Sequence, residues 1–132
     1  MKQGIYTITA NEPIADKTMR MCLHGNQAPA ERAGQFVDIA LEGRFLRRPL
    51  AATEWNGGDF SVIYKIVGEG TAQMAEMPAG AQLDVLTNLG NGFNESLCAT
   101  HALIVCGGIG ASPVFSLAKH LLAKGRKVTV VM

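Results

Sequence analysis

The stretch Leu46–Thr53 reads LRRPLAAT, an apolar segment that carries two adjacent arginines and a proline. Pro49 has a restricted φ and disfavours helical backbone at Arg48, so this stretch predicts an extended strand. An extended arginine followed by small residues is suited to bind a phosphate, because its guanidinium donates two parallel hydrogen bonds to the phosphate oxygens. Taken alone, the stretch also fits an edge strand with two solvated arginines.

Further strands are expected on both sides of this stretch, because apolar and polar residues alternate and turn residues separate the runs. The expected strands are Gly4–Ala10, Thr18–His24, Gln35–Leu41, Leu46–Thr53, Phe60–Val67 and Gln82–Leu86. The first is expected to end at Asn11-Glu12-Pro13, and Asn56–Asp59 is expected to form a turn. One short helix is expected at Thr71–Met77, with Thr71 as its N-cap. Short strands at this spacing predict a closed, six-stranded antiparallel β barrel.

The last third of the chain has a different pattern. Ala102–Cys106 is a continuous apolar run, as in a parallel strand that is buried on both faces. A glycine loop follows, then a helical pattern from Pro113 to Ala123, and then a second apolar strand at Lys127–Met132. This order predicts one α/β unit of the βαβ type after the barrel. We therefore expect a barrel domain in residues 1–87, a linker in 88–100 and a partial nucleotide-binding unit in 101–132.

Two glycine-rich segments have the residue types that bind phosphate groups. Gly68, Gly70 and Thr71 lie between an expected strand and an expected helix, where glycine lets backbone amides approach an anion closely. The segment Gly107–Pro113, GGIGASP, follows a strand and opens a helix, which is the setting of a dinucleotide-binding loop. Each segment taken alone is also typical of an ordinary turn into a helix.

The order of four motifs resembles the ferredoxin reductase superfamily. These motifs are Arg48-Pro49, YKIVGEGT at 64–71, LGNGF at 89–93 and GGIGASP at 107–113. More narrowly, the chain is similar to the electron-transfer subunits of the NAD-dependent class of dihydroorotate dehydrogenase, from about Tyr6 to Val131. Chains of that family are much longer, so we expect this one to be truncated.

The resemblance implies that the barrel binds FAD. The implied contacts are Arg48, Gly68, Gly70 and Thr71 to the diphosphate, and Pro49, Leu50, Ala51, Ile63, Tyr64 and Lys65 to the isoalloxazine ring. The family usually has serine or threonine where this chain has Ala51, positioned to hydrogen-bond the flavin N5. Here that hydrogen bond would have to come from a backbone amide or from Thr53.

The resemblance also implies a second nucleotide and a partner protein. Gly107, Gly108, Gly110 and Pro113 would hold the pyrophosphate of NAD, but the groups that the family supplies from later strands are absent, so this site is expected to be weak or incomplete. In the family, NADH reduces FAD, and electrons leave through a 2Fe-2S cluster toward a partner dehydrogenase of pyrimidine biosynthesis. We expect a catalytic dehydrogenase subunit as partner, and a homo-oligomer formed through the truncated nucleotide-binding portion. The alternative is a non-catalytic barrel that has lost its flavin and serves as an interaction domain.

The net charge, the hydropathy and the cysteine count limit which kinds of partner and cofactor the chain is expected to bind. A formal net charge of +1 gives no electrostatic reason to expect binding to nucleic acid or to a membrane surface, and no apolar window reaches the length of a membrane span. The three cysteines, Cys22, Cys98 and Cys106, are odd in number and widely spaced, which is typical of a reducing cytoplasm. A cluster site needs about four close cysteines, so we expect no 2Fe-2S cluster and no metal in this chain.

Overall fold

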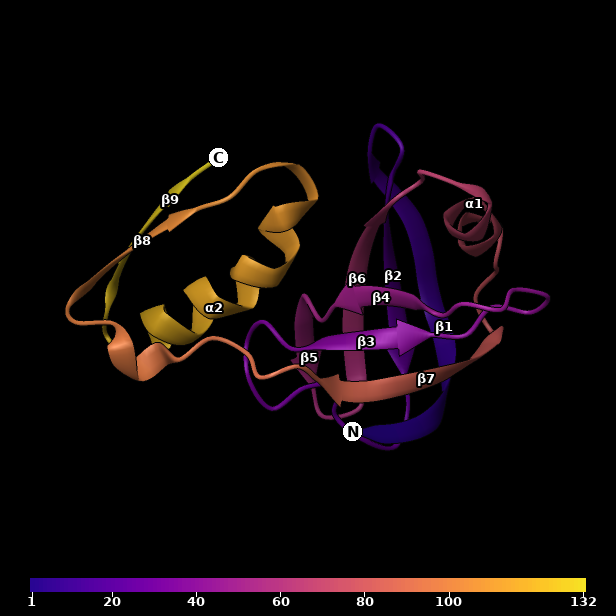
Figure 1. Cartoon of the computed structure of the whole chain (residues 1–132), viewed down its shortest axis with the longest axis horizontal. Coiled ribbons are helices and arrows are strands. Elements are labelled where there is room, and N and C mark those ends of the chain that lie inside the picture. Colours follow the sequence, from indigo (N-terminus) through magenta and orange to yellow (C-terminus); the bar gives the residue numbers. More distant parts are fainter.

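The computed structural model describes all 132 residues and confirms a curled antiparallel sheet followed by a βαβ unit (Figure 1). The sheet has seven strands in the order β4-β3-β7-β1-β2-β6-β5. Their bounds are β1 Lys2–Ala15, β2 Thr18–His24, β3 Phe36–Ile39, β4 Arg48–Ala51, β5 Glu54–Asn56, β6 Asp59–Lys65 and β7 Gln82–Leu89. The sheet curls until β4 lies against β6, but no strand ladder joins these two, so the barrel is not closed by hydrogen bonds.

Alternation along the strands builds the core of the barrel. In β6, for example, Phe60, Val62 and Tyr64 face inward, whereas Ile63 and Lys65 face outward. The same period of two buries one face of each long strand, as expected for a sheet that packs on only one side. The buried core residues are Tyr6, Ile8, Met19, Met21, Leu23, Val37, Ile39, Leu41, Phe60, Val62, Tyr64, Met74, Leu83 and Val85.

Two differences from the sequence-based expectation concern the strands. The first strand does not end at Asn11-Glu12-Pro13 but continues to Ala15, pairing with β2 across a register shift beside Pro13. Asn11 is retained in the strand because its side chain has partners: Nδ2 donates to the carbonyls of Met74 and Met77. The seventh strand, β5, was not expected, because three residues with one apolar side chain are too few to show a period.

The short helix begins earlier than expected. Helix α1 spans Glu69–Ala75 and its N-cap is Gly68, so the prediction of Thr71 as N-cap is wrong. Thr71 is instead the third helical residue, where its Oγ1 accepts hydrogen bonds from the backbone N–H groups of Val67 and Gly68. The hydroxyl therefore stabilises the start of the helix from inside, as the glutamate or glutamine of a capping box does.

The βαβ unit follows the expected order. Strands β8 (His101–Val105) and β9 (Lys127–Val131) pair in parallel, and helix α2 (Ala111–Ala123) connects them. A short 3-10 turn precedes each of β8 and α2. These turns are η1 at Glu95–Leu97 and η2 at Gly108–Gly110. Helix α2 lies between the two-stranded sheet and the barrel (Figure 1), so one face of the small sheet is covered and the other is bare. No helix in the structure is long and apolar enough to span a membrane.

Candidate functional site

Arg48 and Gly70 approach each other closely although 22 positions of sequence separate them (70 − 48 = 22). A Cβ atom added to Gly70 would lie 2.3 Å from Nε and 2.4 Å from Nη2 of Arg48. Only glycine leaves room for the guanidinium against the first turn of α1. The structure therefore brings together the arginine and the glycine turn that the sequence singled out for a diphosphate.

The guanidinium of Arg48 has free donors at this place. Its Nη1 donates to the carbonyl of Leu46 at 2.5 Å, and it makes no ion pair with a carboxylate. Beside it, the backbone N–H groups at the start of α1 have no partner within the helix, as at any helix start. The arrangement offers several donors to one anion.

Arg47 is engaged elsewhere. Its Nη2 lies 3.1 Å from Oδ1 of Asp84, and its Nη1 donates to the carbonyls of Asp38 and Asp84 at 3.2 Å. Strand β4 is an edge strand of the sheet, as in the alternative interpretation, but neither its first residue, Arg48, nor the preceding Arg47 is simply solvated. Arg47 is a structural residue and Arg48 is available to a ligand.

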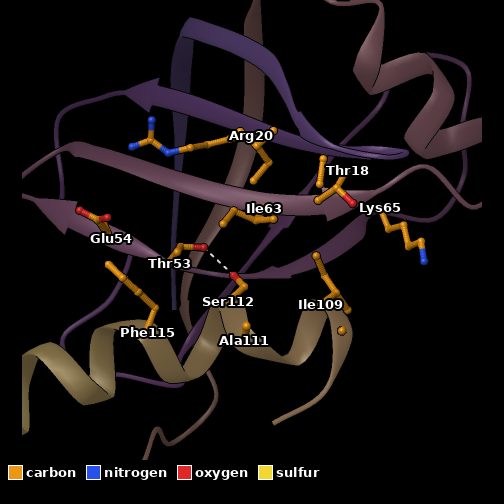
Figure 2. Close-up of a pocket in the computed structure, with 13 residues that line it drawn as sticks. Thr18, Arg20, Thr53, Glu54, Ile63, Lys65, Ile109, Ala111, Ser112 and Phe115 are labelled. Carbon is orange, nitrogen blue, oxygen red and sulfur yellow. Dashed lines mark hydrogen bonds between the residues drawn. The ribbon is translucent and has the colours of Figure 1, made fainter. Parts of the chain in front are cut away.

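A cavity of about 390 Å³ lies between the barrel and the βαβ unit. Thr18, Arg20, Thr53, Ile63 and Lys65 line it from the barrel, and Ile109, Ser112 and Phe115 line it from the other side (Figure 2). Neither Arg20 nor Lys65 makes an ion pair within the chain. Apolar side chains line this cavity together with the cations of Arg20 and Lys65 and the carboxylate of Glu54, and its size suits a flat ring with polar edges.

Of the β6 residues predicted to contact the ring, only two face the cavity. Ile63 and Lys65 line the cavity, whereas Tyr64 points into the barrel core, where its hydroxyl donates to Oδ1 of Asn11 at 2.9 Å. The side chain of Tyr64 therefore cannot contact a ligand in this cavity, because strand alternation turns it inward. Burial raises the pKa of Tyr64, so its phenol stays protonated at neutral pH.

The residues of β4 do not line the cavity. Leu50 packs against the barrel core, Pro49 is exposed on the edge strand, and Ala51 is half-buried opposite Phe36. Proline is tolerated at this place because the strand has a partner on only one side. These three residues stay predicted contacts.

The glycine loop of the βαβ unit reaches the same cavity. Gly108 lines it and has a φ of 55°, a conformation that favours glycine. Gly107 and Gly110 have open space where a side chain would be, and Pro113 lies in the first turn of α2. The loop is thus accessible, and through Gly108 it forms part of the cavity wall.

Contacts along one face of α2 hold the two parts of the chain together. Lys119 lies 3.5 Å from the carboxylate of Glu54, and the ring of His120 packs edge-on against Trp55 at 5.6 Å between centroids. Ser112, two turns earlier on the helix, hydrogen-bonds Thr53. The unexpected strand β5 and the residue before it are therefore the docking site for the helix.

Sequence reasoning missed several of the cavity residues. Thr18 and Arg20 are outward-facing residues of β2, and Phe115 is on α2; none belongs to a motif. The one available signal was alternation, which turns Thr18 and Arg20 to the same side of the strand. The structure also brings together no group of three side chains that could ligate a metal: Cys22 lies in β2, whereas Cys98 and Cys106 directly follow η1 and β8.

Comparison with known proteins supports the resemblance. No protein-family model matches the chain. The chain is 40% identical to the dihydroorotate dehydrogenase B (NAD(+)) electron transfer subunit of Fusobacterium nucleatum, over all of this chain and 54% of that protein. It is 35% identical to the subunit of the same name from Streptococcus thermophilus, over 96% of this chain and 51% of that protein. The chain spans about half the length of the curated relatives it matches.

Solved structures show the same fold. An NADH-dependent reduced ferredoxin-NADP oxidoreductase is 29% identical with a TM-score of 0.85, over 95% of this chain and 48% of that one. Phthalate dioxygenase reductase is 23% identical with a TM-score of 0.83, over 96% of this chain and 42% of that one. The chain is therefore similar, over nearly its whole length, to part of these electron-transfer proteins, and the resemblance inferred from the four motifs is confirmed.

Proposed function

We propose that this chain is a flavoprotein electron-transfer module that binds FAD and belongs with an NAD-dependent dihydroorotate dehydrogenase of the B type. The observation that carries the proposal is the contact between Arg48 and Gly70 at the start of α1, together with a cavity of about 390 Å³ that Lys65, at the end of the preceding strand, lines. A cationic donor beside free backbone amides fits a diphosphate, and the cavity fits a planar ring. The similarity to electron transfer subunits supports the same assignment.

In this proposal the residues of the site divide into two groups. Arg48 and the backbone of Gly68, Gly70 and Thr71 bind the diphosphate, and the bare Cα of Gly70 leaves the space that the guanidinium occupies. Ile63 and Lys65 hold the ring within the cavity, with the backbone of Pro49–Ala51 at its side. Bound FAD supplies the redox chemistry, since it accepts a hydride and releases electrons one at a time.

The proposed role of the glycine loop is weak binding of NADH. Gly107, Gly108, Gly110 and Pro113 would seat the pyrophosphate, and the accessibility of the loop and the position of Gly108 in the cavity wall support this. The chain has one βαβ unit of two parallel strands, which gives the nicotinamide nucleotide few further contacts. We expect flavin reduction by NADH to be slow in this chain.

The proposed partners follow from the relatives and from the bare sheet. The relatives are named as subunits, so the proposed electron acceptor is a catalytic dehydrogenase subunit in the cytoplasm, serving pyrimidine biosynthesis. The outer face of β8 and β9 exposes apolar side chains, which supports a homo-oligomer formed there. We also propose that residues 1–87 and 101–132 are separate units joined by residues 88–100, of which Asn88 and Leu89 still belong to β7.

Titration with FAD tests the assignment of Arg48. Loss of a charge-assisted phosphate contact costs about 1.5–3 kcal/mol of binding free energy. Arg48→Ala is therefore expected to raise the FAD dissociation constant at least about tenfold. Arg47→Ala is the matched control: it removes the neighbouring guanidinium, which is engaged by Asp84, and is expected to affect affinity much less. An unchanged constant for Arg48→Ala would refute the diphosphate assignment.

A further inference from the structure

The two parts of the chain meet in a hydrogen bond between two buried hydroxyl groups. Oγ1 of Thr53 lies 2.5 Å from Oγ of Ser112. Thr53 is only 4% exposed and Ser112 only 5% exposed, yet both side chains line the cavity between barrel and helix α2. In Figure 2 they point toward one another from the two sides, beneath Ile63.

A count of hydrogens shows that the pair is not complete. Each hydroxyl has one hydrogen to donate and two lone pairs to accept. One hydrogen is used between the two oxygens, and neither hydroxyl makes any other hydrogen bond in the structure. The second hydrogen therefore has no acceptor in the protein, and a buried donor without a partner is costly. Both residues line the cavity, so an acceptor atom of a ligand there would satisfy this hydrogen.

We propose that Thr53 and Ser112 act as one hydrogen-bond donor to the ring system bound in this cavity, supplied jointly by the barrel and the βαβ unit. The inference rests on the proposed function, since the ring is that of FAD. It also accounts for Ala51, which has no hydroxyl to offer from β4. Because Thr53 holds the oxygen of Ser112, the direction of the free donor depends on both residues. The pair thus positions the ring and links its environment to the docking of α2.

The test uses the whole chain and FAD as the probe. The double variant Thr53→Val/Ser112→Ala removes both hydroxyls and nearly preserves shape. It is expected to raise the FAD dissociation constant about fivefold to tenfold, which is the effect of losing one hydrogen bond. It is also expected to change the visible spectrum and the midpoint potential of the bound flavin, because the donor interacts differently with the oxidised and the reduced ring. Thr53→Val alone is expected to give a smaller change in the same direction, and Thr53→Ser none.

Ser116→Ala is the matched control. Ser116 lies one turn further along the same face of α2, is 3% exposed, has no hydrogen-bond partner and does not line the cavity. Its loss is expected to leave affinity, spectrum and potential unchanged. A double variant with weaker binding but an unaltered spectrum and potential would show that the pair only joins the two parts, and would overturn the proposal. If the double variant fails to fold, an unaltered spectrum and potential in Thr53→Val would do the same.

The outcome also distinguishes this proposal from the proposed function. If the wild-type chain binds FAD and the double variant is identical to it, the donor pair is wrong and the flavoprotein assignment stands. If the wild-type chain does not bind FAD, both are wrong.

Discussion

Gly70 shows how one missing side chain shapes the site. The guanidinium of Arg48 comes so close to the backbone of Gly70 that no space is left for a Cβ atom. Glycine is therefore required here because of this close contact and not because of its backbone conformation. The Arg-Pro and GEGT motifs predicted that the two residues act together. Thr53 was a candidate donor and Ser112 lies in the glycine loop, but no local pattern indicated that the two would meet across 59 positions.

Gly70→Ala is expected to weaken FAD binding while preserving the fold. The new methyl group would displace the guanidinium of Arg48, which is the end of a flexible side chain and can move at little cost. We expect the dissociation constant to weaken about tenfold, and the free energy of unfolding to change by less than about 1 kcal/mol. Gly110→Ala is the control, since a Cβ there meets nothing within 4 Å and its φ of −62° suits any residue. Equal affinities for Gly70→Ala and wild type would contradict the joint role of Arg48 and Gly70 in binding the diphosphate.

At the scale of elements, α1 depends on a polar contact with the barrel core. The Asn11 side chain accepts a hydrogen bond from the Tyr64 hydroxyl and donates to the carbonyls of Met74 and Met77. It therefore connects β6, β1 and the end of the helix. This network explains why β1 continues through a segment that reads as a break. Turn-forming residues predict the end of a strand reliably only when their side chains do not find hydrogen-bond partners in the folded structure.

The buried tyrosines predict how stability depends on pH. Burial raises the pKa of Tyr64 and of Tyr6 above the ordinary value of 10.0. Above about pH 10 the unfolded chain loses these protons first, so the free energy of unfolding falls as pH rises through the higher folded-state pKa. Tyr64→Phe is expected to make that fall shallower and to cost about 1 kcal/mol at neutral pH, because the Asn11 amide loses a partner. Urea denaturation between pH 8 and pH 11 measures both, and equal pH slopes for the two proteins would contradict the assignment.

At the scale of the whole molecule, the sequence predicted the succession of barrel and βαβ unit better than their contact. Six of the seven sheet strands have a period that can be read, and Thr18–His24 has the expected bounds. The order of strands in the sheet and the docking of α2 on β5 depend on long-range packing that no local pattern encodes. The cavity of about 390 Å³ lies at that contact, which is why most of its lining was not anticipated.

The bare face of the small sheet predicts self-association. Leu103 is 68% exposed and Val105 is 72% exposed, and both point away from α2 beside Val131. We expect sedimentation to show a dimer or a larger species, and Val105→Lys to shift it toward monomer because a charge cannot be buried in an apolar contact without cost. Leu122→Lys, on an exposed face of α2, is expected to have no such effect. A wild-type chain that stays monomeric at high concentration would contradict an interface on this face.

The central claim is that the chain binds FAD, and the visible absorption spectrum of the purified protein tests it most directly. We expect a yellow protein, or a colourless one that takes up one equivalent of added FAD and retains it through gel filtration with the spectrum of a bound flavin. A folded, colourless protein that takes up no FAD would contradict the claim and would favour the alternative of a barrel that serves only as an interaction domain.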